Sequence, residues 1–128
     1  MKRFLLIFAV FLFACQAKSP SETVAREFVE AYYVRADLPK VLLWTDGYAT
    51  EKVNTSIRLI EGQVKEATTR PKVAYKLLES QVDGQEARHL FLLKIKPPTY
   101  PEIQKKALVR VRERKTGEWK VTQFSEIE

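Results

Sequence analysis

The sequence has few of the residues from which disulfide frameworks and metal sites are built. Its 128 residues include one Cys, one His and four Gly. A single Cys excludes an intramolecular disulfide, so the fold must rest on packing. One His and scattered carboxylates make a metal site improbable. No Gly-rich phosphate loop, nucleophile elbow or internal repeat is present. We therefore predict no metal and no cofactor.

Long apolar runs are also scarce, and the longest lies at the N-terminus. Lys2 and Arg3 precede eleven consecutive apolar residues, 4–14. A helix of that length rises only ~17 Å against a hydrocarbon core of ~30 Å, which favours a signal peptide over a membrane span. We expect a signal peptide at residues 1–14, a short tether at 15–18 and a single domain at 19–128.

The apolar run ends in Leu12-Phe13-Ala14-Cys15, which resembles the lipobox of bacterial lipoprotein precursors. Leu12 and Ala14 match that pattern, whereas Phe13 is bulkier than the residue usually found there. The resemblance implies that the Cys15 thiol receives a diacylglycerol and that Cys15 becomes the first mature residue. With Gln16 next, it implies an outer-membrane location facing the periplasm if the host has two membranes. The alternative is an ordinary secretory leader with an incidental cysteine.

The first half of the mature chain has the apolar period of amphipathic helices. We predict helices over about 19–35, 37–46 and 50–69, the first two beginning at the capping residues Ser19 and Asp37. The third helix begins after Thr50, and its apolar side consists of Val53, Ile57, Ile60 and Val64.

The second half changes to the alternation of strands. We predict strands over about 72–81, 89–95, 106–114 and 118–125. A turn at 82–85 and a proline-rich loop at 96–101 separate the first three strands.

The last hairpin has two possible registers. A three-residue loop with Gly117 in the left-handed conformation separates apolar from charged residues, so we choose it over a two-residue loop. It places Arg112 opposite Lys120, a slightly destabilising pair. One face then carries Val109, Val111, Trp119 and Val121, and the other carries Arg110, Arg112, Arg114 and Lys120.

Three helices and a four-stranded meander ending in Gly117-Glu118-Trp119-Lys120-Val121 resemble the nuclear-transport-factor-2-like or cystatin-like superfamily, and most of all its small bacterial lipoproteins. The resemblance implies an α+β fold in which three N-terminal helices pack on a curved four-stranded antiparallel sheet, forming a cone. It also implies a ligand pocket inside the cone, unless the aromatic residues simply fill the core. The pocket candidates are Phe28, Tyr32, Trp44, Tyr75, Phe91 and Trp119.

Enzymes of this superfamily place an Asp or His inside the cone as a proton acceptor. In this sequence Asp37 and Asp46 occupy helix ends, and Asp83 lies in a hairpin turn. His89 stands alone at a strand start, with no acid at a spacing that would orient it. We therefore predict that the protein is not an enzyme.

The excess of positive charge lies in the strand half. Residues 67–128 hold 13 basic and 8 acidic residues, whereas residues 15–66 hold 7 and 8. The four basic residues of the last hairpin could face an envelope protein or anionic head groups, each contributing ~1 kcal/mol near anionic lipid. They could also be a solvated face that protects the sheet from association. Nucleic acid is improbable as a partner outside the cytoplasm.

These patterns together predict a membrane-anchored bacterial envelope lipoprotein that acts as a non-catalytic binding module for an envelope partner. The membrane contact is made through acylated Cys15. One alternative is a carrier or sensor of a small apolar ligand in the cone, and another is a cryptic enzyme of the same superfamily.

Overall fold

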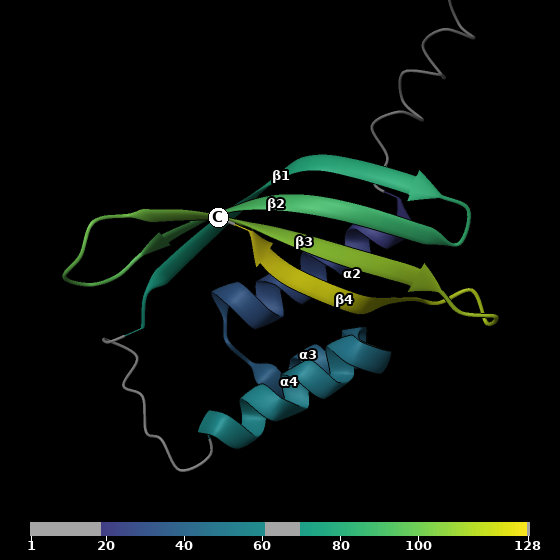
Figure 1. Cartoon of the computed structure of the whole chain (residues 1–128), viewed down its shortest axis with the longest axis horizontal. Coiled ribbons are helices and arrows are strands. Elements are labelled where there is room, and N and C mark those ends of the chain that lie inside the picture. Colours follow the sequence, from purple (N-terminus) through teal and green to yellow (C-terminus); the bar gives the residue numbers. More distant parts are fainter. Residues whose placement is uncertain (1–18, 61–69, 128) are drawn as a thin grey trace, which may run out of the picture.

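The computed structural model describes residues 19–60 and 70–127. They form a curved four-stranded antiparallel sheet with helices packed on one of its faces (Figure 1). This arrangement confirms the predicted α+β fold with N-terminal helices and a C-terminal meander. The predicted signal peptide, the tether with Cys15, and Val64 lie outside the described residues.

The helical half consists of short, differently wound segments. Helix α2 (Pro20–Val29) continues directly into a π-helix, η1 (Glu30–Val34). Helix α3 (Leu38–Val41) continues into a 3-10 helix, η2 (Leu42–Trp44), and helix α4 follows (Gly47–Ile60). Among the described residues, three helical units therefore precede the sheet, as predicted.

The first two helices begin at the predicted capping residues. The Ser19 hydroxyl accepts a hydrogen bond from the Glu22 amide at 3.2 Å, and the Asp37 carboxylate accepts one from the Lys40 amide at 3.4 Å. These bonds satisfy amide groups that have no partner within a helix. The Glu22 carboxylate itself accepts from Arg26 Nε at 2.9 Å.

Helix α4 begins earlier than predicted. The amide of Thr50 donates to the carbonyl of Asp46, and the amide of Ala49 lies within reach of the same oxygen. Helical winding therefore starts at Gly47, three residues before the predicted start at Thr50. Along its inner side Val53 is buried.

The π-helix was not predicted. The amide of Arg35 donates to the carbonyl of Glu30, five residues earlier, at 2.9 Å. This winding is rare in proteins. It places Tyr32 and Tyr33 at 5.6 and 6.4 Å from Phe28, measured between ring centroids, so both tyrosines join one aromatic cluster.

The strands are β1 (Lys72–Asp83), β2 (Glu86–Lys96), β3 (Ile103–Glu113) and β4 (Trp119–Ile127), longer than or shifted from the predicted ranges. They pair in the order β1-β2-β3-β4, each antiparallel to the next. Loop 97–102 joins β2 to β3, in agreement with the predicted proline-rich loop.

The predicted register of the last hairpin is confirmed. Val111 lies opposite Val121, and Arg112 lies opposite Lys120. Gly117 has a φ of 90°, which an L-residue adopts only with strain. The register then shifts by one residue at Thr122, and a similar irregularity occurs at Leu78 in β1. Neither irregularity was predicted.

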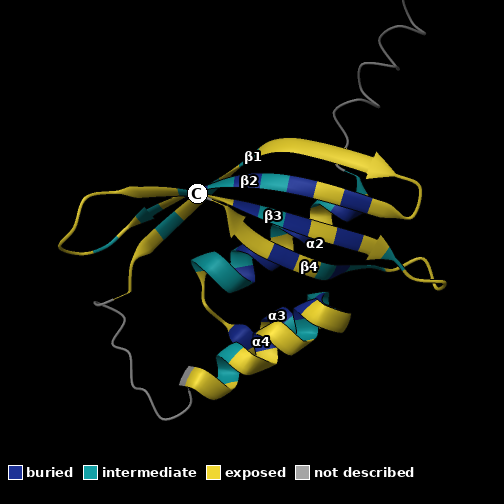
Figure 2. Ribbon diagram, in the orientation of Figure 1, coloured by how far each residue is buried: buried dark blue, intermediate teal, exposed yellow. Residues whose placement is uncertain are grey.

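The core lies between the helices and the concave face of the sheet. Buried residues alternate with exposed ones along β2 and β3 (Figure 2). The largest apolar side chains fully buried in this layer are Phe28, Phe91, Leu93, Val29, Val41, Val53, Val109, Val111 and Val121. The opposite face of the sheet, which we call the outer face, has no helix of the described residues packed against it.

Candidate anion-binding groove

The outer face of the sheet is strongly basic. The strand register places eight basic side chains over it and three acidic ones, Glu79, Asp83 and Glu86. The basic residues are Lys72, Lys76, Arg88, Lys94, Lys96, Lys106, Arg110 and Arg112. Lys120 shares their register, but its Nζ reaches the helical side. The positive excess that the sequence places in its second half is therefore collected on one surface.

Four hydrogen-bond donors cross this face in a single row, one from each strand. Gln81 pairs with Arg88, Arg88 with Arg110, and Arg110 with Gln123. We call these four residues the donor row. Their amides and guanidinium groups are planar donors, which suit the oxygens of a phosphate or carboxylate.

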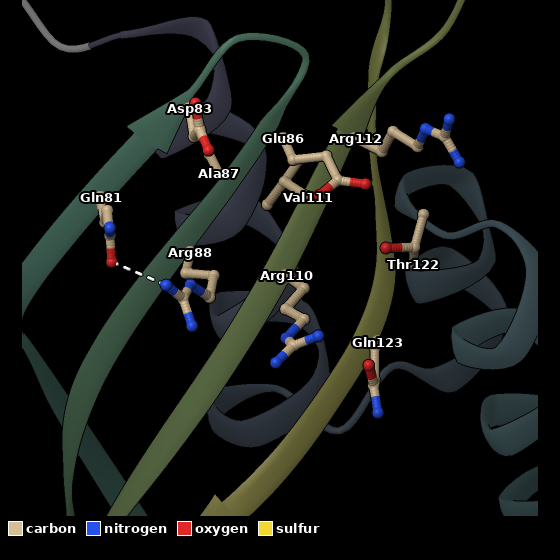
Figure 3. A pocket seen from close by; sticks show the side chains of 10 residues that line it. All are labelled: Gln81, Asp83, Glu86, Ala87, Arg88, Arg110, Val111, Arg112, Thr122 and Gln123. Carbon is tan, nitrogen blue, oxygen red and sulfur yellow. Dashed lines mark hydrogen bonds between the residues drawn. The ribbon is translucent and has the colours of Figure 1, made fainter.

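The arginines of this region are unequally engaged. Arg88 donates from Nη2 to Gln81 Oε1 at 2.8 Å, as the dashed line in Figure 3 shows. Among the described residues, Arg110 and Arg112 form no side-chain hydrogen bond or ion pair. Arg88 and Arg110 are also direct cross-strand neighbours, and like charges in that position destabilise a sheet. An anion between them would relieve this repulsion.

A hollow of about 420 Å³ lies over the donor row. All four donor-row residues line it, together with Arg112, Asp83, Glu86 and Thr122 (Figure 3). A second hollow of about 260 Å³ adjoins it and shares Arg112 and Thr122 with it. Both hollows lie at the turn end of the sheet, and we call the first one the arginine groove.

Of the four basic residues proposed from the sequence, two line the main hollow and two contact the helical side. Arg110 and Arg112 line the main hollow. Arg114 forms an ion pair with Asp46 and donates from Nε to Asp46 Oδ2 at 2.6 Å, which holds the pKa of that carboxyl below its usual value. Lys120 donates from Nζ to the carbonyl of Leu43 at 2.5 Å. Arg114 and Lys120 therefore fasten the sheet to the helical side.

Sequence reasoning missed Arg88 and the two glutamines. The alternation along β2 could have placed Arg88 on the outer face, because its neighbours in the pattern, His89 and Phe91, belong to the predicted buried face. Its position beside Arg110 was not available, because that depends on how β2 pairs with β3.

The six aromatic pocket candidates are part of the core or pack against it. Phe28 and Phe91 are fully buried, and the other four candidates are half-buried against the core. The rings of Phe28 and Tyr32 stack with 5.6 Å between centroids, and those of Tyr75 and Phe91 meet edge to face at 5.9 Å. Four of the six candidates thus contact aromatic neighbours, and Trp44 and Trp119 pack against the core.

Two buried polar atoms lie near this core. Within the described residues, Trp44 Nε1 has no hydrogen-bond partner, and the Tyr33 hydroxyl lies beside the Glu126 carboxylate without a hydrogen bond of normal geometry. Burial raises the pKa of the Tyr33 hydroxyl far above its usual value, and the negative charge of Glu126 raises it further. Tyr33 is therefore protonated at neutral pH, and both groups are potential hydrogen-bond donors.

His89 is buried, and each of its ring nitrogens faces a hydroxyl group. Nδ1 lies 2.8 Å from Ser80 Oγ, and Nε2 lies 3.1 Å from Ser21 Oγ. Burial lowers the pKa of His89, and the charge of Arg26 lowers it further, whereas the Glu22 carboxylate acts in the opposite direction. The neutral imidazole thereby connects the first turn of α2 to β1 and β2.

Among the residues that the structure describes, no group of three or more His, Cys, Asp or Glu side chains could hold a metal ion. None of the helices in this part of the chain is long and apolar enough to cross a membrane.

Comparisons with known proteins identify the fold. No family model and no curated protein matches the sequence. A ketosteroid isomerase-like protein from Erwinia carotovora atroseptica matches the structure with a TM-score of 0.61, covering 84% of this chain and 94% of that one at 17% identity. The fold is nuclear-transport-factor-2-like. A SEC-C motif containing protein from Rhodopseudomonas palustris also matches, with a TM-score of 0.61, 16% identity, and coverage of 91% and 87%. At these identities the nuclear-transport-factor-2-like likeness concerns the fold alone.

Proposed function

We propose that this chain is a lipid-anchored protein of the bacterial envelope that acts by non-catalytic binding, with the arginine groove as its binding site. The groove takes an anionic group of its partner, a phosphate or a carboxylate. The observation that carries the proposal is the donor row, in which Arg88 and Arg110 lie directly opposite each other. The structural neighbours support the nuclear-transport-factor-2-like fold of the domain, and the donor row supports an anionic ligand.

The side chains that could support catalysis have other roles. Both ring nitrogens of His89 face serine hydroxyls, Asp37 caps α3, and Asp46 is paired with Arg114. A general base needs a free lone pair within reach of a substrate proton. These contacts support a binding role for the domain.

Binding to the groove can be tested by nuclear magnetic resonance with inorganic pyrophosphate as the probe. The Nε–H signals of Arg88, Arg110 and Arg112 should shift together and saturate, whereas that of exposed Arg58 on α4 should not. The substitution Arg110→Gln should abolish the saturable shift at the remaining groove arginines. Equal, non-saturating shifts at Arg58 and at the groove would show non-specific attraction and would contradict the proposal.

The lipid anchor is tested separately by mass spectrometry of the protein isolated from its host membranes. The expected N-terminal residue is Cys15, with a diacylglyceryl thioether on Sγ. A retained initiator Met1 or a free thiol at Cys15 would show that the anchor proposal is wrong.

A ligand inside the cone is the second candidate function. Its support is the buried donor Trp44 Nε1, which has no partner among the described residues, together with the buried Tyr33 hydroxyl in the same core. Polar ligand atoms could accept from them while the aromatic cluster contacts apolar parts. Native mass spectrometry of the gently purified protein should then show added mass that the substitution Trp44→Phe reduces. A bare protein mass would count against this candidate.

A further inference from the structure

We infer that the partner of the outer face is the anionic surface of the membrane that carries the anchor, and that the sheet lies down on it. This inference rests on the proposed lipid anchor and names the partner of the same groove. Its first support is the distribution of charge. Basic residues extend along the whole outer face, from Arg112 beside the turn end to Lys72 and Lys96 at the other end. A single small anion would engage only the groove, whereas an extended surface of phosphate groups engages the whole face.

The second support is an apolar centre within the basic face. Leu90 lies directly opposite Leu108, and Leu92 is the next residue of β2 on the same face. All three leucines are half-buried, although no described helix covers them. Arg88 and Arg110 lie on one side of this leucine patch. Lys94 and Lys106 lie on the other, as the register shows.

Cations around an apolar centre match the membrane interface, where head-group phosphates lie outside the acyl chains. The leucine patch can contact the acyl boundary while the flanking basic side chains bind phosphates. Long basic side chains extend their charged ends toward such groups.

The third support is the place where the chain leaves the domain. Ser21 lies in the first turn of α2, and its Oγ is 3.1 Å from Nε2 of His89. Arg88 is the residue next to His89 and projects to the outer face. Ser19 is four positions after Cys15, a span of at most ~14 Å. The chain therefore enters the domain at the same end of the sheet as Arg88.

Electrostatic contact acts over about 8 Å at physiological ionic strength. The anchor thus raises the local concentration of head groups at the basic face and makes weak contacts effective. A separate envelope protein would have to displace this nearby surface.

The test uses the lipidated full-length product in two kinds of vesicle, phosphatidylcholine alone and an equimolar mixture with phosphatidylglycerol. A neutral fluorophore is attached through Ser125→Cys on the outer face, or through Asn54→Cys on α4 as the control. Cys15 is the only native cysteine, so its acylation leaves the introduced thiol as the only free one. Acrylamide, an uncharged quencher, reports exposure to water.

On the mixed vesicles we expect quenching at position 125 to fall several-fold relative to neutral vesicles, and quenching at position 54 to stay unchanged. The pair Arg88→Glu and Arg110→Glu should abolish this protection. The pair Lys40→Glu and Arg58→Glu alters net charge equally at exposed positions of α3 and α4, and should preserve it. High salt should remove the protection without releasing the protein from the vesicles.

Several outcomes would overturn the inference. Equal quenching at position 125 on both vesicles would show that the face does not meet the membrane. Protection that survives the double reversal of Arg88 and Arg110 would show that another surface makes the contact. Flotation separates this inference from the anchor. A protein that floats only with anionic vesicles retains the docking face and lacks the anchor, whereas one that floats with neither has neither.

Discussion

At the scale of single residues, Ala36 has a conformation that does not suit its side chain. It follows the π-helix with a φ of 53° and is exposed. The left-handed region costs an L-residue about 1–2 kcal/mol, and glycine avoids this cost. The amide of the next residue, Asp37, donates to the carbonyl of Ala31 at 2.9 Å, which fixes the turn.

We therefore predict that Ala36→Gly stabilises the protein. The free energy of unfolding in urea should rise by about 0.5 kcal/mol, because relief of strain exceeds the added freedom of the unfolded chain. Ala74→Gly, at an exposed position of β1, is the control and should lower it by about 0.5–1 kcal/mol. Destabilisation by both substitutions would contradict the assignment of strain to Ala36.

His89 makes stability depend on pH. Because its folded-state pKa lies below the ordinary value of 6.5, the unfolded chain binds more protons as pH falls through that value. The free energy of unfolding should therefore fall between pH 7 and pH 5.5. His89→Gln should be less stable at pH 7 and should flatten this dependence. Urea denaturation at several pH values measures both effects, and an unchanged slope would refute the prediction.

At the scale of elements, like-charge pairs between neighbouring strands of the outer face lower the stability of the sheet. Arg88 lies directly opposite Arg110, and Arg112 lies opposite Lys120. Lys72 and Lys96 form a third like-charge pair. Such pairs destabilise a sheet, so an exposed face without a binding role would be more stable with mixed charges.

Arg110→Glu should accordingly raise stability while it removes binding. We expect the free energy of unfolding to increase by about 0.5 kcal/mol, because a repulsive cross-strand pair with Arg88 becomes attractive. Arg110→Gln should give a smaller increase, and added salt should reduce both. Denaturation in urea at low and high salt measures this, and loss of stability in both variants would indicate a structural role for Arg110.

The elements that the sequence predicts are those whose pattern is set locally. The loop at Gly117 and the apolar residues Trp119 and Val121 permit only one register that buries one face, and the structure has it. The π-helix could not be predicted, because the apolar rows through Tyr32 and Tyr33 fit an α-helix equally well. The irregularity at Thr122 lets Val121 and Phe124, three residues apart, both face the core, a spacing that the prediction overlooked.

The candidate site was predictable only in part, for the same reason. Alternation along β3 places Arg110 and Arg112 on the outer face. That Arg88 belongs to the site follows only from the pairing of β2 with β3. That Arg114 does not belong to it follows only from its ion pair with Asp46. Both are tertiary facts that join residues distant in the sequence.

At the scale of the whole molecule, charge is distributed unequally between two surfaces. The outer face carries eight basic side chains, and the helices and core lie behind it. A field from clustered charges is stronger than that of the same charges dispersed. The protein should therefore orient near any negatively charged surface.

Cation-exchange chromatography in non-ionic detergent should detect this clustering. Replacing Arg88 and Arg110 by Gln should lower the salt needed for elution more than replacing Lys40 and Arg58 by Gln, although net charge changes equally. Circular dichroism checks that each variant is folded. Equal elution of the two double variants would show that retention follows net charge alone.

The π-helix Glu30–Val34 also affects how this chain should be aligned with distant homologues. A π turn holds one more residue than the corresponding α turn, so a homologue with a regular helix needs one residue fewer between Val29 and Asp37. An ungapped alignment then assigns the wrong counterpart to every position on one side of this segment. A one-residue gap placed within this segment restores the correspondence and should reveal homologues that ungapped alignments miss.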